Sequence, residues 1–86
     1  MIQRISEPVS VVASYNAKNR TVRPISVEWS ERVYPVLQVG LRHTYRDGVT
    51  RHHVFSVIAS SLFFRLNLNA DNLIWTLEEV SDGLPD

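Results

Sequence analysis

Cysteine is absent from this chain, so neither a disulfide bond nor a thiolate nucleophile is available to it. Long apolar runs are absent as well. No stretch approaches the roughly 18 residues that a membrane helix requires, and the first residues, Met1 to Arg4, lack the apolar segment of a signal peptide. We therefore expect a protein of the cytoplasm, with no membrane partner.

Basic residues are missing from one part of the chain, although the net charge is zero. Residues 1–65 hold all nine Lys and Arg residues and four acids, a net charge of +5, whereas residues 66–86 hold five acids and no Lys or Arg. Such a division accompanies some nucleic-acid surfaces that lie beside an acidic segment. It also fits a basic sheet face folded next to an acidic strand, and the basic residues are dispersed rather than gathered in a run.

What the chain does contain is a two-residue alternation of apolar side chains, at residues 25–29, 64–68 and 73–77. Successive side chains of a strand point to opposite faces, so this spacing predicts half-buried β-strands. The expected strands are residues 8–15, 22–29, 32–45, 50–59, 62–68 and 73–80.

Short strands at regular spacing, without a crossover helix, predict sequential hairpins. We therefore predict an all-β fold, a single small antiparallel barrel or rolled sheet of about six strands. This single β domain spans residues 1–86, with residues 81–86 as a flexible tail. Residues 54–66 also fit helical spacing, but their β-branched and aromatic residues and the Ser60-Ser61 break favour strand, turn and strand.

Two turns set the expected register. A two-residue loop at Ser30-Glu31 pairs Trp29 with Arg32, Val27 with Tyr34 and Ile25 with Val36. Neither loop residue is the Gly or Asn that a primed turn prefers, so a longer loop with a different register remains an alternative. Asp47-Gly48 is the strongest turn signal, and as a two-residue loop it pairs Leu41 with Val54 and His43 with His52. Pro35 and Gly40 predict an edge, a bulge or a bend in the third strand.

Cations and rings gather around this last hairpin. The candidate nucleic-acid-binding residues are Arg42, His43, Tyr45, Arg46, Arg51 and His52, and Lys18, Arg20 and Arg23 extend the set. A small barrel that presents cations beside aromatic rings is suited to binding a phosphate backbone and stacking bases. If His43 and His52 face each other, they also form two ligands of a divalent metal, with Asp47 as a weak third, but such a set is too small for a tight site.

No motif indicates catalysis. There is no Gly-x-Ser-x-Gly sequence, and the adjacent Glu78 and Glu79 point to opposite faces of a strand. We expect no enzyme, no cofactor and no small-molecule substrate. Trp29 and Trp75 are expected to anchor the core. The middle hairpin is apolar on both faces, with Tyr34, Val36, Phe55 and Val57 on one and Leu37, Val39, Leu41 and Ile58 on the other. This pattern predicts either closure of a barrel or a protein partner, such as a second copy.

Residues 22–83 resemble a family of small bacterial β domains of unknown function. The resemblance is carried by Arg23-Pro24, Trp29-x-x-Arg32-x-Tyr34-x-Val36, Phe55-x-Val57, Trp75-x-Leu77-x-x-Val80 and Asp82-Gly83. Members occur alone or attached to proteins that resemble translesion DNA polymerases, so the resemblance implies a DNA-associated accessory role. The family is richer in Trp and Arg where this chain has residues 40–51, and no functional residue is transferred. The sequence thus predicts a non-catalytic interaction or accessory module of the bacterial cytoplasm, with self-association or a protein partner. The alternative is a nucleic-acid-binding β-barrel that uses the basic hairpin of residues 42–53.

Overall fold

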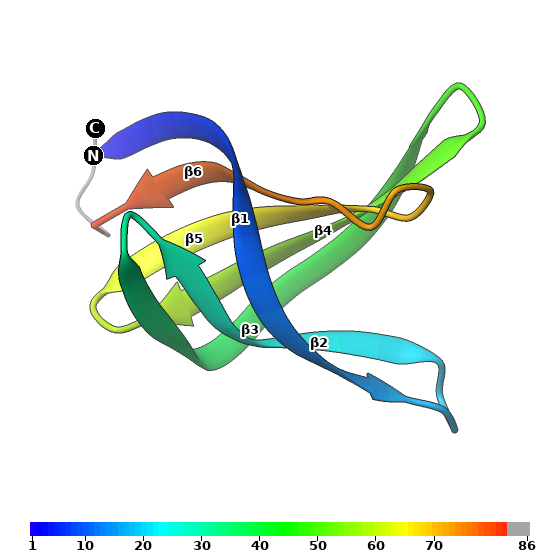
Figure 1. The fold of residues 1–86 in the computed structure, drawn as a ribbon, viewed down its shortest axis with the longest axis horizontal. Helices are drawn as coiled ribbons and strands as arrows, with labels where there is room; N and C mark the ends of the chain where they lie inside the picture. Colours follow the sequence, from blue (N-terminus) through cyan, green and yellow to red (C-terminus); the bar gives the residue numbers. More distant parts are fainter. Residues whose placement is uncertain (83–86) are drawn as a thin grey trace.

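The computed structural model describes residues 1–82, and these residues form six antiparallel strands and no helix (Figure 1). The strands are β1 (Ile2–Asn16), β2 (Thr21–Trp29), β3 (Arg32–Asp47), β4 (Thr50–Ala59), β5 (Leu62–Asn69) and β6 (Trp75–Ser81). Each strand pairs with the next along the chain, and β1 also pairs with β6, so the sheet closes into a barrel. The predicted all-β fold of six strands in sequential hairpins is confirmed.

The predicted ends of the strands differ from the structure mainly near the termini. β1 begins at Ile2 rather than at residue 8, because its first half pairs with β6. Ser81 belongs to β6 rather than to the predicted tail, and Asp82 accepts a hydrogen bond from the amino group of Met1 at 2.8 Å. The remainder of that predicted tail, residues 83–86, lies outside the described residues.

Residues 54–66 form part of β4, the turn at Ser60 and Ser61, and part of β5, so the strand interpretation is correct. β6 begins two residues later than predicted. Leu73 has a φ of 63° and donates its backbone N–H to the carbonyl oxygen of Asn69 at 2.8 Å. The loop between β5 and β6 therefore turns back on itself before the extended backbone resumes at Trp75.

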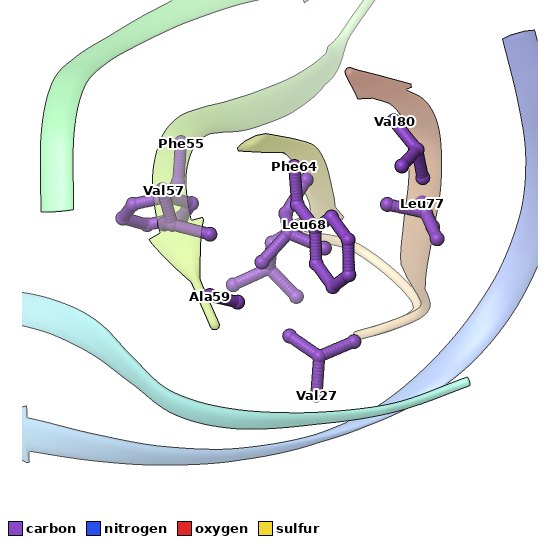
Figure 2. Packing of buried hydrophobic residues seen from close by; sticks show 9 residues of the cluster. Val27, Phe55, Val57, Ala59, Phe64, Leu68, Leu77 and Val80 are labelled. Carbon is purple, nitrogen blue, oxygen red and sulfur yellow. The ribbon is translucent and has the colours of Figure 1, made fainter. Parts of the chain in front are cut away.

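The core follows from the two-residue alternation. Phe64 is 1% exposed, whereas its neighbour Phe63 is 46% exposed, because successive side chains of β5 point to opposite sides. The buried cluster consists of Val27, Phe55, Val57, Ala59, Phe64, Leu66, Leu68, Leu77 and Val80. Figure 2 shows these side chains meeting in the interior of the barrel.

The two tryptophans pack at the margin of this core rather than at its centre. Trp29 makes an edge contact with Phe64 at a centroid distance of 6.0 Å, and its indole Nε1 donates to Glu7 Oε2 at 2.9 Å. Trp75 lies 5.5 Å from the ring of Phe55. Both indoles are half-buried, so each keeps part of its ring at the surface while its apolar face covers the core.

The turn between β2 and β3 has the two-residue loop that the alternation predicts. Trp29 pairs with Arg32, and pairing continues as far as Ser26 and Pro35. The loop residues Ser30 and Glu31 have φ angles of 53° and 65°. Two positive φ angles are typical of a type I′ turn, so the poor loop sequence is accommodated at the expense of backbone strain rather than by a longer loop.

The predicted pairing of Ile25 with Val36 is wrong, because β3 leaves β2 at this point and joins β4. Val36 pairs with Ala59, as the predicted register of the β3–β4 hairpin requires. Two irregularities then follow in β3, between residues 36 and 38 and between residues 39 and 42. Each lets β3 advance by one residue against β4, as in a β-bulge.

At the far end of the hairpin the register has consequently moved by two residues. Val54 is opposite His43 rather than Leu41, His52 is opposite Tyr45 rather than His43, and Arg42 is opposite Phe55. The predicted pairs of Leu41 with Val54 and His43 with His52 are therefore wrong. The loop is Gly48-Val49 rather than Asp47-Gly48, and Gly48 has a φ of 63°, as the first loop residue of a type II′ turn requires.

The bend in β3 separates two hairpins at one end of the barrel. β2 pairs with β3 only near their shared turn, so residues 21–25 and 37–47 each have one edge without a strand partner in the described part of the chain. The β1–β2 and β3–β4 hairpins extend from the right-hand end of the barrel in Figure 1 and diverge from each other.

Candidate functional site

A cleft of about 500 Å³ lies between the two diverging hairpins. It is lined by Tyr15, Arg20, Thr21, Val22, Arg42, His43, Thr44, His53, Val54 and Phe55. A smaller hollow of about 280 Å³, lined by Arg23, Leu37, Gln38, Val39, Gly40 and Arg42, shares Arg42 with the cleft. Among residues 1–82, no Asp or Glu side chain lines either one, so the groove that the cleft and the hollow form together presents only positive or neutral groups from the described chain.

The register explains why these side chains face the cleft. Paired residues of an antiparallel ladder share a face. Arg42 pairs with Phe55, which belongs to the core, and Tyr15 pairs with Val22, which packs against the core. Arg42 and Tyr15 therefore continue the inner face of the barrel beyond the point where apolar residues end.

The same face continues toward the tip of the β3–β4 hairpin. Thr44 pairs with His53, and Arg46 pairs with Arg51, two and four residues beyond Arg42. These positions lie on the side of the hairpin that carries Arg42. The cationic surface is thus longer than the cleft itself.

The arginines of this surface have no carboxylate partner among residues 1–82. Arg20, Arg23, Arg42, Arg46 and Arg51 are all exposed, and the ion pairs of the described chain involve Arg65 and the amino terminus instead. Their charge is therefore not neutralised by a direct contact. Arg20 also has a φ of 55°, in the left-handed region that costs a side-chain-bearing residue about 1–2 kcal/mol.

The predicted cluster of six residues is divided between two faces of its hairpin. Arg42, Arg46 and Arg51 lie on the face that continues the core, together with His53, which the prediction omitted. Tyr45 and His52 lie on the opposite face, where their rings stack at a centroid distance of 4.7 Å and an angle of 6°.

His43 alternates with Arg42 along β3, yet it reaches the rim of the cleft. Of the three residues expected to extend the cluster, Arg20 lines the cleft and Arg23 lines the adjoining hollow. Lys18 lies in the turn between β1 and β2, outside both linings. The candidate surface therefore combines two hairpins, only one of which the sequence singled out.

A polar network on the opposite face was not predicted. Asn67 is 6% exposed and is the buried polar residue of the described chain. Its amide nitrogen donates to Tyr45 Oη and to Glu78 Oε2, both at 3.0 Å, and its Oδ1 lies 2.9 Å from His52 Nδ1. Glu78 also pairs with Arg65 at 3.1 Å. The one feature of the sequence that could have indicated this network is the position of Asn67 between two core leucines, Leu66 and Leu68.

This network and the observed register remove the suggested metal pair. His43 is opposite Val54, and the Nδ1 atom of His52 is engaged by Asn67. Within residues 1–82 there is no group of three or more His, Asp or Glu side chains placed to hold a metal ion.

The loop between β5 and β6 supports the hairpin that carries the arginines near its tip. The backbone N–H of Ala70 donates to the carbonyl oxygen of Arg51 at 2.9 Å, and the hydroxyl of Thr50 donates to Asp71 Oδ2 at 2.8 Å. The β3–β4 hairpin is therefore held by contacts outside its own ladder.

An apolar hollow of about 410 Å³ lies on the outer surface, with Leu41, Ile58 and Phe63 among its lining and Arg65 and Glu79 at its polar part. Leu41 is 76% exposed. Closure of the barrel covers only one of the two predicted apolar faces. Val39 was expected on the same face as Leu41, but it packs against the core because it lies between the two bulges, where the register is shifted by one residue.

In the described part of the chain, no helix has the length and apolar character needed to cross a membrane. Comparison of the chain with protein-family models, with curated proteins and with solved structures finds no match.

Proposed function

We propose that this chain is a non-catalytic binding module of the cytoplasm that holds nucleic acid in the cleft between the β1–β2 and β3–β4 hairpins. The observation that carries this proposal is the lining of the groove, which contains Arg20, Arg23 and Arg42 and no carboxylate from residues 1–82. Guanidinium groups bind phosphate oxygens through two parallel hydrogen bonds and are the side chains best suited to a phosphate backbone.

The arrangement of the cations favours a polymer over a single small anion. A compact phosphate site places several donors around one point, whereas these arginines follow the edges of two hairpins and continue to Arg46 and Arg51. A row of cations matches the repeated charges of a nucleic-acid backbone. The acidic strand β6 forms the opposite side of the barrel wall and does not contribute to the groove.

Fluorescence anisotropy with labelled oligonucleotides at about 50 mM and about 200 mM salt tests the proposal. We expect the affinity to fall steeply with salt. Arg42→Ala should weaken binding several-fold and reduce the slope of log affinity against log salt by about 1. Arg32→Ala is the matched control, because this substitution removes the same charge. Arg32 lies at the β2–β3 turn, at the other end of the barrel from the cleft. Absence of binding at the lower salt concentration would overturn the proposal.

A second candidate is self-association through the apolar hollow, and Leu41 and Phe63 support it because they are large, apolar and exposed on the same surface. Arg65 and Glu79 also line this hollow and form an ion pair with each other at 3.5 Å, so the apolar surface has a charged edge without a net charge. Light scattering at high micromolar concentration tests it. Leu41→Lys should abolish dimers, whereas Val33→Lys, at another exposed site, should leave them intact. If the original protein is a strict monomer and binds no hydrophobic dye, self-association is contradicted.

A further inference from the structure

Resting on the proposed function, we infer that the cleft takes a single strand of nucleic acid and that one of its bases stacks on the ring of Tyr15. Tyr15 is 64% exposed and lines the cleft on the β1–β2 side. Tyr45, near the tip of the β3–β4 hairpin, stacks on His52 on the opposite face, Tyr34 packs against Phe64 in the core, and Phe55 is buried in the floor. Tyr15 is thus the large aromatic ring of the cleft with a face open to a ligand.

The floor of the cleft is apolar while its rim is cationic. Phe55 belongs to the buried core and Val22 packs against it, and both lie on the inner face that lines the cleft, whereas Arg20 and Arg42 stand on opposite hairpins. A phosphate has no favourable contact with an apolar floor, whereas the flat face of a base does. The rim therefore suits the backbone, and the floor and Tyr15 suit an unstacked base.

A duplex does not fit this division of the cleft. Its bases are stacked on one another inside the helix, so it presents phosphates and groove edges rather than base faces. A cleft of about 500 Å³ has the size of a pocket for a small organic group. A duplex bound across its mouth leaves Tyr15 and the floor without a ligand.

One arrangement of a duplex remains as the contrary outcome. A two-stranded β-ribbon fits the major groove of DNA, and the β3–β4 hairpin carries Arg46 and Arg51 near its tip. Binding of that kind depends on the hairpin tip and is independent of Tyr15, which belongs to the other hairpin.

The experiment is an anisotropy titration at low salt with four probes of equal length: single-stranded DNA, single-stranded RNA, duplex DNA and an abasic DNA strand. We expect either single strand to bind at least about tenfold more tightly than the duplex and than the abasic strand. The abasic probe carries the same phosphates, so its weaker binding measures the contribution of the bases alone.

Tyr15→Leu should weaken single-strand binding by about tenfold and leave the salt slope unchanged, because it removes a ring and no charge. Tyr15→Phe keeps the ring and should bind within about twofold of the original protein. The melting temperatures of both variants show that the barrel remains folded.

Failure of the inference and failure of the proposed function give different results. If no probe binds at low salt, the function itself is wrong. If duplex and abasic probes bind as tightly as single strands and Tyr15→Leu has no effect, the function stands and the inference is wrong. Tight duplex binding that is lost in Arg46→Ala or Arg51→Ala, and kept in Tyr15→Leu, also overturns the inference.

Discussion

The Nδ1 atom of His52 lies 2.9 Å from the Oδ1 atom of Asn67, and the surrounding contacts assign the proton between them. An ionised Glu78 only accepts hydrogen bonds, so the group of Asn67 that faces it is the amide nitrogen. Asn67 Oδ1 is then the atom directed at His52, and the ring must donate from Nδ1. The packing of β4 against β5 thereby determines that the half-buried His52 directs a protonated Nδ1 at Asn67.

Replacing Asn67 by Ala should lower the free energy of unfolding by about 1–3 kcal/mol, because Tyr45, His52 and Glu78 each lose a hydrogen-bond partner. Urea denaturation measures this change. In a double-mutant cycle with His52→Ala, the coupling should be at least about 0.5 kcal/mol. Strictly additive effects would show that the hydrogen bond contributes nothing to stability.

Phe64→Ala should destabilise the protein by about 3–5 kcal/mol, because Phe64 is buried against Trp29 and Tyr34 and its removal leaves a cavity. Phe63→Ala is the matched control. It removes the same side chain from the neighbouring residue, which is about half exposed, and should cost about 1 kcal/mol or less. Thermal melting of both variants, followed by circular dichroism, compares the two faces of β5. Equal losses are incompatible with the inward position of Phe64.

Glu31→Gly should stabilise the protein by about 0.5–1 kcal/mol. Glu31 has a φ of 65°, where glycine carries no steric penalty, and part of the gain is offset by the greater entropy of glycine in the unfolded chain. For a domain of this size the melting temperature should rise by about 2–8 °C. Glu28→Gly, in the extended part of β2, should lower it. A fall in both variants would contradict the strained turn.

Arg20→Gly should separate stability from binding. Arg20 also has a positive φ, so the variant should be about 0.5–1 kcal/mol more stable, yet it removes a cation from the cleft and should weaken oligonucleotide binding several-fold. Glu31→Gly serves as the control, since it relieves the same kind of strain far from the cleft. A gain in stability with unchanged affinity would remove Arg20 from the binding surface.

Much of the fold is predictable from local alternation. The apolar side of β2, β4 and β5 can be assigned from a few neighbouring residues, because burial of one face requires only a period of two. The central strands and the β2–β3 turn follow from this pattern. The closure of β1 on β6 does not, since it joins opposite ends of the chain and leaves no trace in the local spacing.

The register of β3 against β4 shows most clearly why part of the site was missed. Two bulges move the pairing by two residues, so every side chain beyond the second bulge is again on its original face, and only the residues between the bulges, such as Val39, change sides. Beyond the second bulge the hydrophobic pattern is therefore the same in both registers. Only the partners change, which places Tyr45 rather than His43 opposite His52.

The sequence by itself determined that the chain is a β-protein with a cation-rich hairpin, because strand propensity, alternation and residue type are local properties. The tertiary structure alone decided that Arg20 and Tyr15 lie across a cleft from Arg42, and that Asn67 joins Tyr45, His52 and Glu78. These groupings depend on where β3 leaves β2 for β4, and that choice is a competition between distant strands which no short segment encodes.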